Sequence, residues 1–138
     1  MIKSVSIGEE IVITTKNKIG LLADISKMLA DEGINIEAAV GYMIGDVAKL
    51  MLVTSANLRI VGELQKQLYK SVKEIEEVMV EIENKPGALK VVTTELKKAG
   101  IDIRHLYITS PTSAGGSSRM VLETSDNEEA IALLSKYI

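Results

Sequence analysis

The 138-residue sequence has no cysteine, no tryptophan and no phenylalanine, and it contains one histidine and two prolines. Without cysteine the chain has no disulfide framework, no thiolate nucleophile and no cysteine-based zinc site. Four tyrosines are its only large aromatic residues. A folded core therefore has to be built from Ile, Val, Leu and Met, and the chain lacks the aromatic platforms on which nucleic-acid bases stack.

Positive charge is not concentrated in any part of the sequence. The net charge is −3, and the lysines are scattered among acidic residues instead of forming a basic stripe. We therefore expect no nucleic-acid partner. The first ten residues lack the apolar segment of a signal peptide, and no apolar run reaches the length that crosses a bilayer. These features predict a soluble, cytoplasmic protein without a membrane partner.

The composition is compatible with a packed core. Hydrophobic residues make up 46% of the chain and charged residues 25%, which is close to the average of soluble globular proteins. The length allows one ordinary domain or two very small ones.

The chain contains an internal repeat, which favours two small domains. Residues 17–39 align with residues 84–106 at a constant offset of 67, and eight of the 23 positions are identical. NKIGLL at residues 17–22 corresponds to NKPGAL at residues 84–89, and GINI at 33–36 corresponds to GIDI at 100–103. A repeat of this kind predicts one supersecondary unit that is used twice.

Each copy begins with an alternating strand pattern and continues with a helical one. Gly33 and Gly100 then stand where a helix C-terminus favours a left-handed glycine. GINIEAAV and GIDIRHLYI predict a second strand in each copy, and residues 48–54 and 118–124 predict a third. A tight turn at 44–46 joins these strands in the first copy, and the looser PTSAGGS joins them in the second. The apolar positions of these first strands and helices are Ile11, Ile13, Leu21, Leu22, Ile25, Met28 and Leu29, and Val78, Val80, Ile82, Leu89, Val92 and Leu96.

A second helix is predicted near the end of each copy. In the first copy Asn57 is the expected N-cap, and Leu58, Val61, Leu64 and Leu68 form the apolar face. In the second copy Ser125 and Glu128 have the spacing of a capping box ahead of Ile131, Leu133 and Leu134.

The element order is that of a ferredoxin-like βαββαβ unit, but the second copy is incomplete. The first copy ends in a strand at 72–75, which leads almost directly into Val78, whereas the second copy has no residues left for its last strand. Residues 3–7, with alternating Val5 and Ile7, precede the first copy. We expect this segment to pair with the sheet of the second copy in the place of the missing strand.

The duplicated glycine turn carries the chemistry that points to a binding site. Gly20 and Gly87 allow a steep strand-to-helix turn and the close approach of a ligand. The helix that follows exposes unpaired amide hydrogens, which suit a carboxylate. Pro86 stiffens the second turn, and Ile19 takes its place in the first. The same glycines and asparagines are also compatible with a purely structural turn.

The pattern N-K-x-G-x-L, an amphipathic helix and then G-I-[ND]-I resembles the signature of the ACT domain. The resemblance covers essentially the whole chain, because both copies carry both halves of the motif. It implies an α+β fold with two tandem ferredoxin-like units side by side, antiparallel sheets and helices on one face. The implied domains are residues 1–75, with the extra strand 3–7, and residues 76–138.

ACT domains bind effectors where two units meet. The resemblance also implies which residues of each unit face the ligand. The turn asparagine, the turn backbone and the polar residue that opens the second strand are the implied contacts. In this sequence they are Asn17, Ile19, Gly20, Leu21, Leu22 and Asn35 in the first copy, and Asn84, Pro86, Gly87, Ala88, Leu89 and Asp102 in the second. Some ACT domains place a histidine two residues before the turn asparagine, where this chain has Thr15 and Ile82.

These features together predict a non-catalytic, regulatory protein that senses a small molecule, an amino acid. The alternative is a regulatory subunit that docks on an amino-acid biosynthetic enzyme without binding an effector itself. An enzyme on the same scaffold is disfavoured because neither turn has an arginine for a phosphate and no nucleophile and base can be paired. We expect no catalytic residue, metal or cofactor, and we assign His105 to the surface or the packing. Small or apolar strand residues, such as Ala39, Gly41 and Met79, favour a homodimer.

Overall fold

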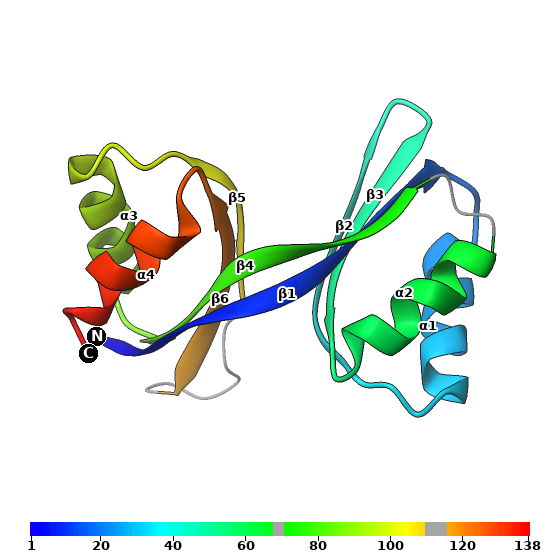
Figure 1. The fold of residues 1–138 in the computed structure, drawn as a ribbon, viewed down its shortest axis with the longest axis horizontal. Coiled ribbons are helices and arrows are strands. Elements are labelled where there is room, and N and C mark those ends of the chain that lie inside the picture. The colour runs from blue at the N-terminus through cyan, green and yellow to red at the C-terminus, as the bar shows by residue number, and fades with distance from the viewer. Residues whose placement is uncertain (68–70, 110–115) are drawn as a thin grey trace. The chain divides into compact units, whose positions relative to one another are not determined.

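A computed structural model describes residues 1–67, 71–109 and 116–138 (Figure 1). The chain divides into two compact units. The first-copy unit consists of residues 9–75, and the second-copy unit consists of residues 1–8 together with residues 76–138. Leu68, which was expected on the second helix, and most of the PTSAGGS connection lie outside the described residues.

The first-copy unit has the ferredoxin-like order of elements. It contains the second part of β1 (Ile2–Lys16), then α1 (Leu21–Asp31), β2 (Ile36–Ile44), β3 (Val47–Thr54), α2 (Asn57–Lys66) and the start of β4 (Ser71–Glu83). The strand order is β2-β3-β1-β4. β3 is antiparallel to both β1 and β2.

The second-copy unit repeats this arrangement with strands from two distant parts of the sequence. It contains the second part of β4, then α3 (Ala88–Lys98), β5 (Ile103–Ile108), β6 (Ser117–Thr124) and α4 (Asn127–Ser135). β6 is antiparallel to both β4 and β5. The order β5-β6-β4-β1 matches that of the first-copy unit, with the first residues of β1 in the position of the last strand.

The N-terminal segment therefore completes the second-copy sheet, as the alternation of Val5 and Ile7 led us to expect. The backbone N–H of Glu83 donates to the carbonyl of Met1 over 2.8 Å. Ile2 is buried in the second-copy core, and Val5 packs against it. The domain boundary predicted from the sequence, between residues 75 and 76, assigned this segment to the first domain. In the structure, residues 1–8 cluster with the second-copy unit because their apolar side chains are buried there.

Each unit has its own aliphatic core between its sheet and its helices. On α1 the buried residues are Leu21, Ile25 and Leu29, which recur at the helical period. Leu22, Leu58 and Leu89 were expected on apolar helix faces, but they are exposed. In each of these helices, residues one helical turn apart already cover the sheet, so the neighbouring leucine points away from it.

The two late helices begin differently from the sequence prediction. Ala56, not Asn57, occupies the cap position of α2. Asp126, not Ser125, caps α4 by accepting a hydrogen bond from the backbone N–H of Glu129 over 3.0 Å. The predicted capping box is therefore wrong, because the aspartate one residue later supplies the acceptor. Within the described parts of the chain, no helix is both long and apolar enough to span a bilayer.

Candidate functional site

The first glycine turn connects β1 to α1. Gly20 adopts a left-handed conformation, with φ 88°, at the start of the helix. The backbone N–H of Asn17 donates to the carbonyl of Asp46 over 2.8 Å, and the N–H of Leu21 donates to the carbonyl of Lys18 over 3.2 Å. No side chain caps the helix. Because α1 lacks a side-chain cap, its first turn can offer backbone donors to a ligand.

The unused donors of this turn lie on the two residues after Leu21. Among the described residues, no acceptor is hydrogen-bonded to the N–H of Leu22 or Ala23. The partial positive charge of a helix N-terminus adds to these donors. The turn can therefore hold a carboxylate by main-chain groups alone.

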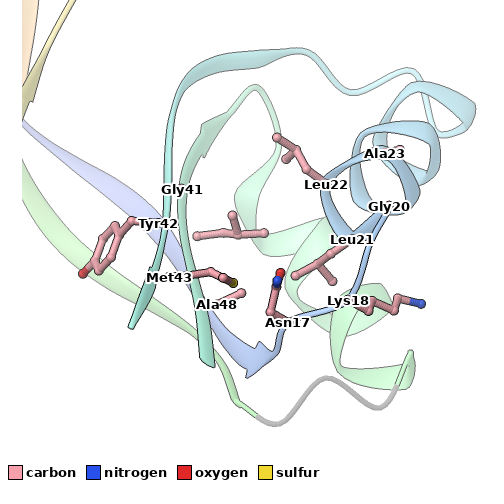
Figure 2. A pocket seen from close by; sticks show the side chains of 11 residues that line it. Asn17, Lys18, Gly20, Leu21, Leu22, Ala23, Gly41, Tyr42, Met43 and Ala48 are labelled. Atoms are coloured by element: carbon pink, nitrogen blue, oxygen red, sulfur yellow. The ribbon is translucent and has the colours of Figure 1, made fainter. Parts of the chain in front are cut away.

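A hollow of about 350 Å3 lies beside this turn (Figure 2). Four residues implied by the resemblance line it: Asn17, Gly20, Leu21 and Leu22. Lys18 and Ala23 of the same segment also line it. The hollow is mainly apolar apart from the turn, so it suits a small ligand with a polar head and an apolar side chain.

The opposite wall of the hollow comes from β2 and β3, and its residues were not among those predicted from the sequence. Its residues are Gly41, Tyr42, Met43, Ala48 and Leu50. A Cβ at Gly41 would lie 2.6 Å from Cδ2 of Leu50, its cross-strand partner. Glycine at position 41 thus leaves room for the leucine side chain. A glycine within a strand pattern is the signal that could have identified this wall.

Two further predicted residues of the first copy lie away from the hollow. Ile19 is fully exposed and does not line it. Asn35 follows the C-terminal end of α1, whereas Asn17 precedes its N-terminal end. The 11 residues of α1 span about 16 Å. The structure therefore does not bring Asn17 and Asn35 together within this unit.

The second glycine turn has the same backbone but different surroundings. Gly87 is left-handed, with φ 90°, and no side chain caps α3. The backbone N–H of Ala88 donates to the carbonyl of Lys85 over 3.2 Å, and the N–H of Asn84 donates to the carbonyl of Gly116 over 2.9 Å. Cε of Met1 lies 3.7 Å from the position that a Cβ of residue 87 would take. Methionine thus packs beside the second turn.

The flanking side chains of this turn also differ from those of the first. Pro86 precedes the left-handed glycine, as the sequence indicates. Ala88 is buried, whereas Leu89 is exposed. Glu83 pairs with the Lys85 ammonium over 2.9 Å and with the N-terminal ammonium of Met1 over 3.3 Å. Hydrogen bonds from these two groups lower the pKa of the Glu83 carboxyl.

Asp102 lies at the other end of α3, in a separate hollow of about 440 Å3. Thr93, Lys97 and Gly100 line this hollow as well. The Asp102 carboxylate and the Lys97 ammonium have no ion-pair partner among the described residues. Asn84 and Asp102 are therefore separated by a helix, like Asn17 and Asn35.

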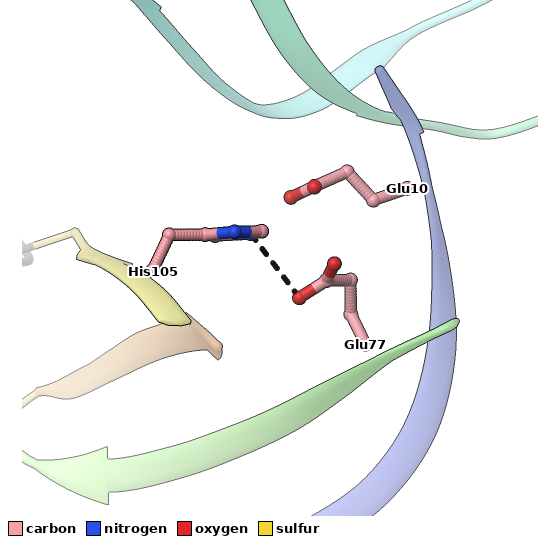
Figure 3. Close-up of side chains that lie close together, drawn as sticks. All are labelled: Glu10, Glu77 and His105. Atoms are coloured by element: carbon pink, nitrogen blue, oxygen red, sulfur yellow. Dashed lines mark ion pairs between the residues drawn. The ribbon is translucent and has the colours of Figure 1, made fainter. Parts of the chain in front are cut away.

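His105 lies in a packed polar cluster of the second-copy unit. Its Nε2 is 3.4 Å from a carboxylate oxygen of Glu77, which is fully buried (Figure 3). Its Nδ1 is 3.2 Å from a carboxylate oxygen of Glu123. The ring stacks on Tyr107, with 6.4 Å between ring centroids. These contacts give the histidine a packing role, one of the two roles expected from the sequence.

No protein-family model matches the sequence, and no curated protein matches it. Solved structures do match over almost the entire chain. They share its α+β fold, with the ferredoxin-like arrangement of strands and helices.

Three of these structures illustrate the similarity. The structure of protein BT0572 from Bacteroides thetaiotaomicron has a TM-score of 0.87 and 23% identity, over 96% of this chain and 90% of that chain. The regulatory subunit of aspartate kinase from Thermus thermophilus, in its ligand-free form, has a TM-score of 0.68 and 12% identity, over 99% and 98%. The aspartokinase alpha and beta subunits have a TM-score of 0.62 and 16% identity, over 99% and 97%. At these identities the similarity establishes the fold.

Proposed function

We propose that this chain is a non-catalytic regulatory protein that binds a small metabolite, an amino acid, at its glycine turns. The observation that carries the proposal is the first turn, where two backbone N–H groups that have no acceptor among the described residues adjoin a mainly apolar hollow of about 350 Å3. A carboxylate suits the N–H groups, and a small side chain suits the hollow.

The positions of the polar residues indicate how a complete site would form. Within each unit the turn asparagine and the strand-opening residue stand at opposite ends of a helix. We therefore propose that another copy of the chain supplies the second type of residue, so that a ligand contacts the turn of one copy and the strand-opening residue of its partner. Asp102 would then accept the ammonium group, and a turn would hold the carboxylate.

The solved structures support a regulatory role rather than a catalytic one. Two of the three described above are subunits of aspartate kinase, and one of these is its regulatory subunit. We extend this role to the present chain as part of the proposal. The homodimer predicted from the sequence is one source of the second unit, and light scattering after size-exclusion chromatography measures it.

Calorimetry and thermal-shift screening against the twenty amino acids test the proposal directly. A ligand of roughly nine heavy atoms at about 0.6 kcal/mol each binds with a Kd of about 0.1 mM. At 10 mM it would raise the free energy of unfolding by about 2.7 kcal/mol. No response to any amino acid at that concentration contradicts the proposal.

Two substitutions connect binding to the first hollow. Gly41→Val forces a side chain against Leu50 and fills the hollow, so the affinity should fall about tenfold or more. Asn17→Ala removes one polar side chain from the lining, so the affinity should fall about three- to tenfold. Leu58→Ala is the control, because Leu58 is exposed on α2 and does not line the hollow. If all three variants bind with the affinity of the wild type, the ligand lies outside this hollow.

Exposed apolar side chains support the second candidate, a regulatory subunit that docks on an enzyme without an effector. Ile19, Leu22, Met43 and Ile44 are all large, apolar and exposed in the first-copy unit, and Leu22 and Met43 line the same hollow. A contiguous apolar surface is typical of protein interfaces. Co-purification from the native host, with and without added amino acids, separates this candidate from the sensor.

A further inference from the structure

Both copies carry a Thr-Ser-x-Asn sequence at the end of their third strand. It reads TSAN at residues 54–57 and TSDN at residues 124–127. From sequence spacing, parts of these segments are expected only to cap helices. Their hydrogen bonds instead form one network that is the same in both units.

The centre of the network is a closed ring between threonine and asparagine. In the first-copy unit, Oγ1 and N–H of Thr54 donate to Oδ1 of Asn57 over 2.6 and 3.0 Å. The N–H of Ala56 donates to Oγ1 of Thr54 over 3.2 Å. The threonine is buried, so its hydroxyl is satisfied entirely within the ring.

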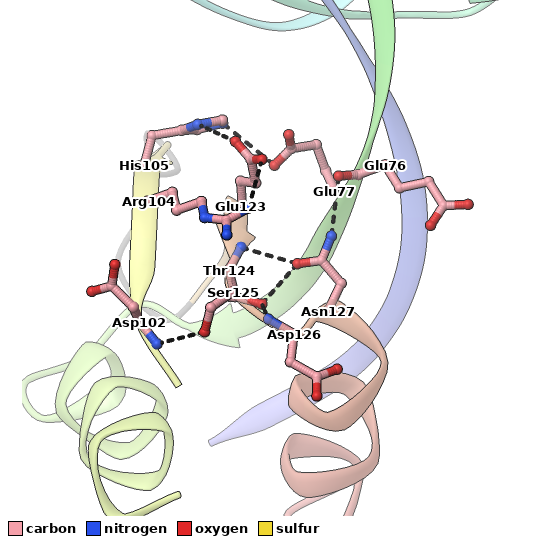
Figure 4. A network of polar contacts seen from close by, with 10 residues as sticks. All are labelled: Glu76, Glu77, Asp102, Arg104, His105, Glu123, Thr124, Ser125, Asp126 and Asn127. Carbon is pink, nitrogen blue, oxygen red and sulfur yellow. Dashed lines mark hydrogen bonds and ion pairs between the residues drawn. The ribbon is translucent and has the colours of Figure 1, made fainter. Parts of the chain in front are cut away.

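The second-copy ring has the same bonds. Oγ1 and N–H of Thr124 donate to Oδ1 of Asn127 over 2.8 and 3.0 Å (Figure 4). The N–H of Asp126 donates to Oγ1 of Thr124 over 3.2 Å. We call each four-residue network a TSxN clamp, meaning residues 54–57 or residues 124–127.

One attachment of each clamp reaches the strand-opening residue. Ser55 accepts from the N–H of Asn35 through Oγ over 3.0 Å, and its own N–H donates to the Asn35 carbonyl over 3.0 Å. Ser125 makes the equivalent two bonds to Asp102, both over 2.9 Å. Figure 4 draws the one in which Oγ of Ser125 accepts from the N–H of Asp102. A single serine thus satisfies both backbone polar groups of the residue just before β2 or β5.

The other attachment reaches a strand at the point where it enters the unit. Nδ2 of Asn57 donates to the carbonyl of Glu9 over 2.7 Å, and Nδ2 of Asn127 donates to the carbonyl of Glu76 over 3.1 Å. Glu9 is the first residue of the first-copy unit, and Glu76 is the first residue after the return of the chain to the second-copy unit. Each clamp therefore joins the strand-opening residue to the incoming strand.

We propose that Ser55 and Ser125 are positioning residues, which hold the backbone of Asn35 and Asp102 so that their side chains are presented to the ligand. This inference rests on the proposed function. In the described parts of the chain, neither the side-chain amide of Asn35 nor the side-chain carboxylate of Asp102 makes a hydrogen bond or an ion pair. In Figure 4 the Asp102 carboxylate points away from Ser125, to which its backbone is bound.

The ligand arm of the test compares two neighbouring residues. Ser125→Ala removes one bond to the backbone of Asp102, so it should weaken binding of an amino acid about three- to tenfold, and Ser125→Thr should restore it. The double variant Ser125→Ala, Asp102→Asn should lose less binding free energy than the two single variants lose together, because both substitutions act through one carboxylate. Asp126→Ala is the matched control, since Asp126 caps α4 and does not contact Asp102. It should lower the stability and leave the affinity unchanged.

A second arm does not depend on a ligand. The amide of Asp102 should be protected from hydrogen exchange in the wild-type chain and in Asp126→Ala, and should lose that protection in Ser125→Ala. If Ser125→Ala lowers only the stability, as Asp126→Ala does, the positioning role is overturned. If the wild-type chain binds no amino acid, the sensing function fails. The clamp is then judged by exchange alone, and unchanged protection at Asp102 overturns it.

Discussion

Gly20 is the residue on which the geometry of the first turn depends. Its φ of 88° lies in the left-handed region, and no described atom lies within 4 Å of the position of an added Cβ. Any cost of a side chain there is therefore a backbone cost, not a steric clash with a described neighbour. The equivalent Gly87 has the same backbone conformation with Met1 beside it.

Gly20→Ala should lower the free energy of unfolding by about 1 kcal/mol, because an L-residue with a Cβ disfavours this conformation. Gly62→Ala is the matched control. Gly62 lies within α2, has no positive φ, and has nothing within 4 Å of an added Cβ. It should raise the free energy of unfolding by about 0.5–1 kcal/mol. Urea denaturation measures both values, and changes of the same sign would contradict the expectation.

Glu74 gives the first-copy unit a dependence on pH. Burial raises the pKa of this carboxyl, and the neighbouring Glu9 raises it further through repulsion and a hydrogen bond. The folded chain therefore binds this proton more tightly than the unfolded chain. The resulting contribution to stability is complete below the ordinary value of 4.5 and is lost as the pH rises from that value through the raised pKa.

Glu74→Gln should remove this loss, so the variant should be more stable than the wild type at neutral pH and show a flatter profile between pH 4 and 7. Glu9→Gln should produce part of the same effect by removing the neighbouring charge. Unfolding midpoints in urea at several pH values measure both variants. A steeper pH dependence in Glu74→Gln would contradict the assignment.

At the scale of elements, hydrophobic periodicity and the repeat predicted the helices and strands. Gly33 and Gly100 both have the predicted positive φ, 70° and 71°, after α1 and α3. The ends of α2 and α4 were less predictable. Asp126 and Ser125 both offer a side-chain acceptor, but Oγ of Ser125 accepts from the backbone N–H of the distant Asp102, and Asp126 caps the helix. Sequence spacing does not contain that long-range contact.

The candidate site was predictable only where it is local in sequence. The turn residues follow from one short motif, and four of those in the first copy line the hollow. The facing wall comes from β2 and β3, and the pairing of β3 with β1 and of β2 with β3 brings these strands beside the turn. Gly41 carried a signal, but its meaning depends on Leu50 across the sheet. Long-range pairings of this kind are not encoded in a local pattern.

The molecule as a whole combines a continuous unit with a discontinuous one. Residues 9–75 form the first-copy unit without interruption, whereas the second-copy unit needs residues 1–8 as well as 76–138. The first segment contributes the buried Ile2 and a strand beside β4. The stability of the two units should therefore respond differently to changes at the N-terminus.

Deletion of residues 1–7 should destabilise the second-copy unit, because it removes that strand and its buried side chain. Hydrogen exchange resolved by residue measures the effect. Amides of β4, β5 and β6 should lose protection, while those of α1 and β3 should keep it. The substitution Lys3→Ala is a control, since Lys3 contributes a bond to Ser117 but little of the core. Unchanged protection after the deletion would contradict the role of this segment.

The discontinuous unit also determines the order in which the protein can fold during translation. Residues 1–8 leave the ribosome some seventy residues before their partner segment of β4. The continuous unit can form while the nascent segment ahead of it still has no neighbour. The second sheet can close only after the rest of β4, then β5 and β6, have been made, so a pause after residue 75 would leave residues 1–8 as an unpaired strand exposed to aggregation.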